Sequence, residues 1–182
     1  MLLYIIMNRS YIKKITFTGV LIAIFVILGT YLSINVYNIK ITFQNLPLFV
    51  GAILYGPIDG FLIGFLGMFV SQLLSPYGFT YTTFLWCMPQ AITGAILGYL
   101  IKKYDIKVEN GPKFWILIIM MHLLITLLNT IVIYIDAKIM GYYSFVYVFS
   151  SFVLRILTSI VVGVVYACVI PIMIRIIKSF MQ

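Results

Sequence analysis

Residues 42–98 limit most strictly what this chain can fold into. They contain three apolar runs in succession, separated by Gly56-Pro57 and by a turn at residues 75–83, and their only charged residue is Asp59. The core of a soluble protein rarely contains three such runs in succession. In a lipid bilayer they are common, because each can form a helix that satisfies its backbone polar groups internally. We therefore expect three membrane helices in this stretch.

The rest of the chain has the same character. Of its 182 residues, 64% are hydrophobic and only 9% are charged, and the mean hydropathy is +1.17. At about 20 residues per span, this predicts an all-α integral membrane protein with six transmembrane helices in one domain, residues 1–182. The apolar runs place the helices at residues 15–34, 43–54, 57–74, 84–101, 114–135 and 145–177.

The positions of the twelve lysines and arginines indicate which way the helices face. The loops at residues 35–42 and 136–144 contain one each, Lys40 and Lys138, and Arg155 lies inside the last helix. The other nine lie near the two termini or in the loop after the fourth helix: Arg9, Lys13, Lys14, Lys102, Lys103, Lys107, Lys113, Arg175 and Lys178. Since cytoplasmic loops are enriched in basic residues, both termini are expected in the cytoplasm.

Several classes of protein are disfavoured. The chain has no G-x-x-x-x-G-K-[ST] phosphate loop and no G-x-S-x-G turn, and its four acidic residues are spread over three separate segments, so we expect neither an ATPase nor another enzyme. No cofactor is expected, and no metal site, because His122 is the only histidine and is expected to be a packed, hydrogen-bonded core residue. The basic residues lie at loop ends, which indicates membrane topology and not nucleic-acid binding.

The chain start and the cysteines carry less information. The first residues lack a basic segment ahead of a short apolar run, so a cleaved signal peptide is not expected, and Met1 and Met7 are both candidate starts. Cys87 and Cys168 are expected near opposite ends of their helices, too far apart for a disulfide.

Arg155 is the strongest single indication of a site. It lies about ten residues into the last predicted helix, ~15 Å along it, and a central arginine costs about 2.5–3.5 kcal/mol on insertion scales. It should therefore face the protein interior, together with Ser151 one turn earlier. Two alternatives remain for the partner of the guanidinium. It is either a structural cluster in which Asp136 and Asn129 form hydrogen bonds with it, or a carboxylate or phosphate of a ligand.

Polar and aromatic side chains gather at the outward ends of the predicted helices. They are either interfacial anchors or the walls of a ligand pocket. The candidates are Gln72 on the third helix, Tyr77, Phe79 and Thr80 in the following turn, Trp86 and Gln90 on the fourth helix, and Tyr143 and Tyr147 near the start of the last.

Small residues recur four positions apart on several helices. Gly60 and Gly64 lie on the third helix and Gly94 and Gly98 on the fourth, where we expect close packing inside the bundle. Gly19 and Ala23 on the first helix could equally face a partner protein.

Three segments, LPLFVGAILYGPIDGFLIGFLG (46–67), YGFTYTTFLWCMPQAITGAILG (77–98) and LNTIVIYIDAKIMGYYS (128–144), resemble the substrate-binding S components of energy-coupling factor (ECF) vitamin transporters. The folate-type branch is the most similar. The resemblance implies high-affinity binding of one vitamin, with folate as first choice and pantothenate next, in an outward-facing pocket. It also implies a T subunit and two ATPases as partners in a bacterial cell membrane. Gly19 and Ala23 correspond to the family's Ala-x-x-x-Ala motif, which meets the T subunit, with a departure at the first position.

Three functions are therefore weighed. The leading hypothesis is a ligand-binding subunit whose transport depends on partner chains. The second is a small ion-coupled carrier that uses Asp136 and Arg155 as a coupling pair. The third is a structural or assembly protein without a ligand, in which Arg155 would be an unexplained cost.

Overall fold

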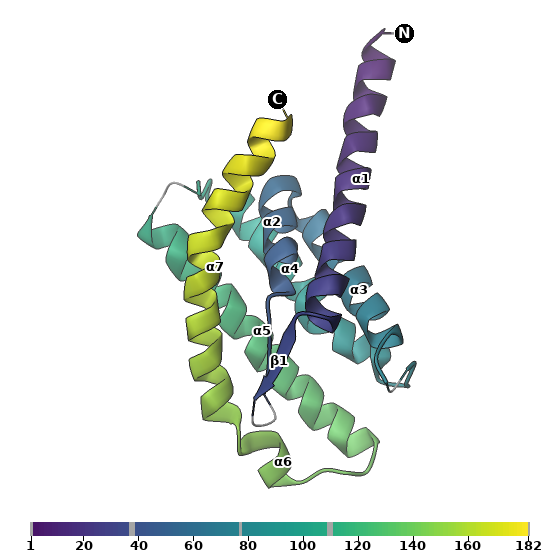
Figure 1. Ribbon diagram of the computed structural model, residues 1–182, viewed down its shortest axis with the longest axis vertical. Helices are drawn as coiled ribbons and strands as arrows, with labels where there is room; N and C mark the ends of the chain where they lie inside the picture. Colours follow the sequence, from purple (N-terminus) through teal and green to yellow (C-terminus); the bar gives the residue numbers. More distant parts are fainter. Residues whose placement is uncertain (1, 37–38, 77, 109–110, 182) are drawn as a thin grey trace.

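The computed structural model describes residues 2–36, 39–76, 78–108 and 111–181 as a helical bundle with one small hairpin (Figure 1). The helices are α1 (Leu2–Thr30), α2 (Asn45–Tyr55), α3 (Pro57–Leu73), α4 (Thr83–Lys103), α5 (Pro112–Ile139), α6 (Phe145–Phe149) and α7 (Phe152–Met181). Strands β1 (Ser33–Val36) and β2 (Ile39–Thr42) pair antiparallel between α1 and α2. Figure 1 shows the start of α1 and the end of α7 at the same end of the molecule, and α6 at the opposite end.

Within the part of the chain that the structure describes, four helical segments are long and apolar enough to cross a membrane: Tyr11–Thr30, Thr83–Lys103, Pro112–Ile139 and Phe145–Ser179. The helices α2 and α3 are apolar but shorter. The helical, membrane-type fold expected from the sequence is therefore found, with four candidate spans and two shorter apolar helices.

The boundary between α2 and α3 is where the sequence predicts it. Gly56 has a φ of +96°, a left-handed conformation that favours glycine. Pro57 opens α3, where its missing N–H costs no helical hydrogen bond. These two residues end one helix and start the next without a loop.

Three predicted boundaries are wrong. The first helix starts much earlier than residue 15. It ends at Thr30, because Ser33–Val36 and Ile39–Thr42 pair as two antiparallel strands and do not continue the helix. The predicted last helix is broken at Ser150 and Ser151 into α6 and α7. Serine side chains compete for backbone hydrogen bonds and weaken a helix interior, which is consistent with a break at that point.

The helices α3 and α4 pack backbone to backbone. A Cβ atom on Gly60 would collide with the backbone of Gly94, and one on Gly64 with the backbone of Gln90. A Cβ atom on Gly98 would meet the Gly56-Pro57 junction. The small-residue pairs predicted on these two helices thus lie in one interface, which we call the glycine seam.

The buried core lies between α2 and its neighbours. Leu48 and Phe49 of α2 are fully buried, as are Ile63 of α3 and Tyr166 of α7. The Tyr166 ring packs edge-on against Phe49 at 5.7 Å, and its hydroxyl donates to the carbonyl of Thr42 at 3.3 Å. This contact ties α7 to the segment that leads into α2, which is also a wall of the cavity described next.

Candidate functional site

A cavity of about 350 Å³ lies among the helices, within the range of about 300–1,000 Å³ typical of small-molecule sites. Side chains from β2, α2, α3, α4, α5 and α7 and the segments beside them form its walls. Most of these side chains are polar and none is acidic. They are Thr42, Gln44, Asn45, Met68, Ser71, Gln72, Ser75, Trp86, Gln90, His122, Ile125, Thr126, Asn129, Thr130, Ile133, Arg155, Thr158, Ser159 and Val162.

The cavity lies in the half of the bundle away from the chain termini. Its walls come mainly from the end of α3, the start of α4, the middle and second half of α5 and the start of α7. Figure 1 shows those helix ends on the side opposite to the start of α1 and the end of α7.

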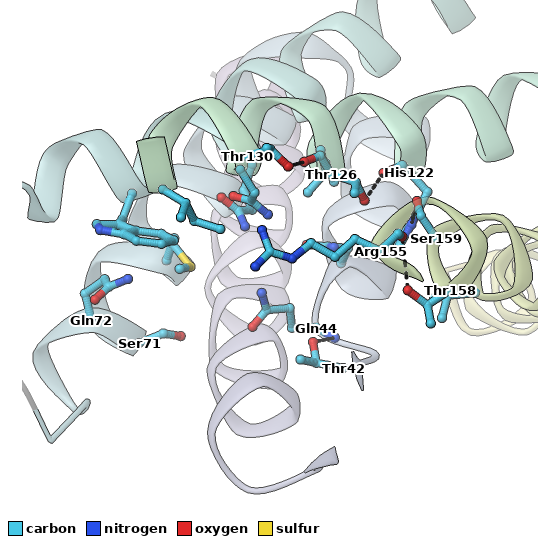
Figure 2. Close-up of a pocket in the computed structure, with 18 of the residues that line it drawn as sticks. Thr42, Gln44, Ser71, Gln72, His122, Thr126, Thr130, Arg155, Thr158 and Ser159 are labelled. Carbon is cyan, nitrogen blue, oxygen red and sulfur yellow. Dashed lines mark hydrogen bonds between the residues drawn. The ribbon is translucent and has the colours of Figure 1, made fainter. Parts of the chain in front are cut away.

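Arg155 extends from the first turn of α7 into this cavity. Figure 2 shows its guanidinium pointing toward the side where Gln72 and Ser71 lie. The predicted depth of about ten residues into one long helix is wrong, because α7 begins only at Phe152. The expected inward direction is nevertheless observed, and one guanidinium nitrogen, Nη1, is buried without a hydrogen-bond partner.

The structural cluster of Asp136 with Arg155 is not formed. The Asp136 carboxylate is buried and accepts a hydrogen bond from the Tyr142 hydroxyl. Burial, together with this hydrogen bond, raises the pKa of Tyr142, so the phenol stays protonated and keeps donating. Among the described residues, the one ion pair joins Lys14 and Asp59, so the charge of Arg155 has no counter-charge within that part of the chain.

A polar stripe on α5 forms one wall. His122, Thr126, Asn129 and Thr130 are spaced by four, three and one residues and share a helix face. The hydroxyl of Thr130 donates to the carbonyl of Thr126 at 2.9 Å, and that of Thr126 to the carbonyl of His122 at 3.2 Å. The two threonine hydroxyls thus donate their hydrogens within the helix, and their oxygens can still accept hydrogen bonds from a molecule in the cavity.

His122 is both a core residue and a wall residue. Its side chain is 8% exposed, and Nδ1 lies 2.8 Å from the Ser159 hydroxyl across the α5–α7 contact. Its ring also packs edge-on against Tyr166 at 5.1 Å. The predicted packed, hydrogen-bonded histidine is confirmed, and it lines the cavity as well.

The structure brings five of the predicted site residues together around the cavity: Gln72, Trp86, Gln90, Asn129 and Arg155. Six others lie outside its walls: Phe79, Thr80, Asp136, Tyr143, Tyr147 and Ser151. Tyr77 lies outside the described residues. Asn129 was a candidate both for substrate binding and for a structural cluster with Arg155; it lines the cavity, and its Oδ1 is buried without a hydrogen-bond partner.

The predicted residues outside the cavity have other contacts. The backbone N–H of Thr80 donates to the Thr83 hydroxyl at 2.9 Å, which shapes the turn before α4. Phe79 is 59% exposed and packs against Phe84. Tyr143 packs against Tyr134, and Tyr147 packs against Tyr142, which is consistent with the interfacial alternative.

Sequence reasoning missed most of the polar wall. Thr126 and Thr130 could have been found from their helical spacing with His122 and Asn129. Gln44 and Asn45 carried no such signal, because they reach the cavity only through the turn that starts α2.

The predicted docking pair lies on an open face of α1. Gly19 and Ala23 are both exposed, and a Cβ atom on Gly19 would have no heavy atom within 4 Å. Large apolar side chains flank them, including Ile15, Val20 and Ile27. Docking of a partner at this face stays a prediction.

Residues 9–176 match the family model described as "ECF-type riboflavin transporter, S component". This match covers most of the chain and confirms the resemblance to ECF S components. The family consists of substrate-binding components of transporters, not of enzymes. Its description names riboflavin, whereas the folate-type branch inferred from the sequence has no support from this match.

Several streptococcal relatives, each called "UPF0397 protein", are similar to the chain. The Streptococcus thermophilus strain LMD-9 protein is 31% identical over 101 residues, which are 55% of this chain and 54% of the relative. The Streptococcus agalactiae serotype Ia protein is 32% identical over 109 residues, 59% of this chain and 58% of the relative. The Streptococcus pneumoniae strain CGSP14 protein is 31% identical over 122 residues, 66% of this chain and 64% of the relative. The alignments thus span between about half and two thirds of these relatives. From the family match, the chain belongs to the ECF-type riboflavin transporter S component family.

Proposed function

We propose that this chain is the high-affinity substrate-binding subunit of an ECF-type importer for an anionic vitamin or related micronutrient, and that the cavity under Arg155 holds it. The family match supports the class of protein. The observation that carries the ligand assignment is the buried, unpaired guanidinium nitrogen of Arg155 in a cavity without acidic side chains.

The charge of Arg155 is the reason for an anionic ligand. A charge taken out of water without a partner costs several kcal/mol. The acidic residues in the described part of the chain are used or placed elsewhere: Asp59 pairs with Lys14, Asp136 accepts from Tyr142, and Asp105 follows α4. A ligand carboxylate or phosphate would supply the missing charge and accept two N–H bonds from the guanidinium plane.

The side on which the cavity lies supports uptake from outside. With both termini in the cytoplasm and α2 and α3 counted as spans, the cavity belongs to the outer half of a six-helix plasma-membrane bundle. Riboflavin is named by the family description. Folate and pantothenate, ranked first from the sequence, remain candidates because both carry carboxylates. Delivery inward would rest on a T subunit and two ATPases, since no phosphate loop occurs in the sequence.

The ion-coupled carrier loses its basis. That hypothesis needs Asp136 and Arg155 as a coupling pair, but the Asp136 carboxylate accepts a hydrogen bond from the Tyr142 hydroxyl instead.

The test is retention of a small molecule through purification. Wild-type protein from cells grown in vitamin-rich medium should release an anionic compound on denaturation, detected by mass spectrometry. Arg155→Ala should lose it, with affinity lower by about 100-fold, the loss expected from removing a buried charge pair. Arg175→Ala is the matched control, since Arg175 lies exposed near the other end of α7. Equal retention by Arg155→Ala and wild type would refute the assignment.

A further inference from the structure

Three carboxamide side chains around the cavity have no hydrogen-bond partner for their carbonyl oxygens. Asn45 at the start of α2 is 6% exposed and Gln90 of α4 is 1% exposed, and both line the cavity. Asn129 of α5 lines it as well. The atoms Asn45 Oδ1, Gln90 Oε1 and Asn129 Oδ1 are all buried and unpaired.

Such groups are uncommon in folded proteins. Nine tenths or more of buried polar groups are paired, and each unpaired one destabilises the fold. The helix satisfies the backbone but not these side chains, and a cavity inside a bilayer has little bulk water to replace a partner.

The same cavity contains a spare donor. Arg155 Nη1 is buried and unpaired, although guanidinium N–H groups are ideal partners for carboxamide oxygens. A purely structural polar cluster would bring them together. Here, three acceptors from three helices and one cationic donor face one space and do not bond to one another, an arrangement suited to a molecule that lies between them.

The apolar walls restrict that molecule further. Trp86, Met68 and Ile125 line the cavity beside the carboxamides. An indole ring stacks on flat rings and a thioether makes favourable sulfur–aromatic contacts, so both side chains favour a flat ring in the cavity.

Resting on the proposed function, we propose that the ligand is an anionic nitrogen heterocycle. Its charged group faces Arg155, and at least two N–H or O–H donors face the carboxamides of Gln90, Asn45 and Asn129. The carboxamides thus select for donors on the ring system, which charge recognition at Arg155 cannot do. An acyclic acid and an uncharged ring would each satisfy only one part of the cavity.

The experiment compares affinities for several probe molecules by isothermal titration calorimetry; riboflavin and riboflavin 5′-phosphate differ only in the phosphate. The probes are riboflavin, riboflavin 5′-phosphate, folate and pantothenate. Either riboflavin 5′-phosphate or folate should bind at least about 10-fold more tightly than both uncharged riboflavin and acyclic pantothenate. The tighter of the two is then compared with an analogue that lacks one donor: the N3-methyl form of the flavin, or the 2-desamino form of the pterin. The analogue should bind wild type about 10-fold or more weakly, because one carboxamide oxygen is left unpaired.

Variants locate the effect. Gln90→Met should weaken the parent probe by about 10-fold or more and reduce the difference between parent and analogue, as expected for two groups that interact. Asn129→Leu is the second variant, should Gln90→Met fail to fold. Thr93→Val is the matched control: the Thr93 hydroxyl is also buried and unpaired on α4, but it does not line the cavity, so affinity should not change.

The two proposals fail in different ways. The donor assignment is overturned if wild type binds parent and analogue equally tightly, or if Gln90→Met and Asn129→Leu both bind the parent probe as tightly as wild type. In either case, loss of the ligand in Arg155→Ala would still support the proposed function. A donor-free anionic compound released from the purified protein would also overturn the donor assignment alone, whereas an uncharged compound would overturn both proposals. If no probe binds and no compound co-purifies, the proposed function itself fails, and this inference with it.

Discussion

Two basic side chains, Lys14 and Arg155, sit among apolar helices in very different ways. Lys14 Nζ lies 2.7 Å from Asp59 Oδ2, and Thr18 donates to the other carboxylate oxygen at 3.2 Å. Arg155 has a buried nitrogen and no carboxylate among the residues around its cavity. A charge with its counter-charge is typical of a structural contact, whereas a charge held without one is typical of a binding site.

Removing Lys14 should destabilise the protein. Lys14→Ala leaves the carboxylate of Asp59, only 8% exposed, without its cation. We expect a loss of about 1–3 kcal/mol, or a fall in Tm of about 3–10 °C for a chain of this length, measured by thermal unfolding in detergent. Lys13→Ala, at an exposed neighbouring position, should leave Tm unchanged. Lys14→Ala combined with Asp59→Asn should recover part of the loss. A Lys14→Ala variant as stable as wild type would contradict a stabilising pair.

Individual site residues were predictable only where an unusual side chain stood out. Arg155, Trp86 and Gln90 were found because a charge, an indole and a carboxamide are rare within apolar runs. Asn45 was missed, since its position depends on how β2 leads into α2, a tertiary feature. Asp136 was one of two partners considered for Arg155, but the Tyr142 hydroxyl donates a hydrogen bond to its carboxylate instead, a contact that the sequence does not indicate.

At the scale of elements, the glycine seam joins α3 and α4 more tightly than any side-chain contact could. Their backbones approach so closely at Gly60 and Gly94 that even a methyl group has no room. With little hydrophobic force between helices in lipid, this packing is a main source of association.

Gly60→Ala should therefore separate α3 from α4. Overpacking against the backbone of Gly94 should cost about 1–3 kcal/mol and lower Tm by several degrees, measured by thermal unfolding. Gly19→Ala makes the same chemical change where no heavy atom lies within 4 Å, and it should leave Tm unchanged or slightly raised. If both variants unfold at the wild-type temperature, the seam is not close-packed in the membrane.

Helix boundaries were predictable where local chemistry fixes them. Gly56 and Pro57 end α2 and start α3 whatever surrounds them. The break at Ser150 and Ser151 was not predicted, because apolar residues continue on both sides and hydropathy does not register a change of direction. The two strands were not predicted either: Ser33 and Ile34 were assigned to the first helix and the rest to a linker, because four residues are the shortest run in which a strand alternation can be detected.

At the scale of the whole molecule, the orientation in the membrane decides on which side the cavity opens. The described parts of the bundle place the turn after α5 and the loop after α4 at opposite ends. The distribution of lysine and arginine predicts that the turn after α5 is outside.

Labelling in intact cells should confirm this orientation. In a background where Cys168, exposed, and Cys87, buried, are replaced by serine, Met140→Cys should react with a membrane-impermeant maleimide. Lys107→Cys should react only after the membrane is permeabilised. Both positions are exposed, so accessibility within the fold is not limiting. The reverse pattern would place the cavity on the cytoplasmic side and exclude uptake from outside.

Transport should require partner chains. Liposomes that contain only this protein should bind, but not accumulate, radiolabelled riboflavin 5′-phosphate or folate, whichever binds the purified chain, under proton and sodium gradients. Accumulation driven by either gradient would favour the ion-coupled carrier, whereas uptake that appears only after a T subunit and two ATPases are added supports the S component.

The length of α3 has a consequence for the surrounding lipid. At 17 residues it extends ~25 Å, less than the ~30 Å thickness of the hydrocarbon layer, while α5 at 28 residues extends ~42 Å. Ile58, Phe61 and Leu66 of α3 are exposed on the surface of the bundle. On the proposed six-span topology, acyl chains would contact this helix, so the leaflets beside α3 would have to thin and those beside α5 would have to thicken unless that helix tilts. The proposed topology thus predicts a bilayer that is thinner beside α3 than beside α5, and a preferred direction of tilt for the molecule.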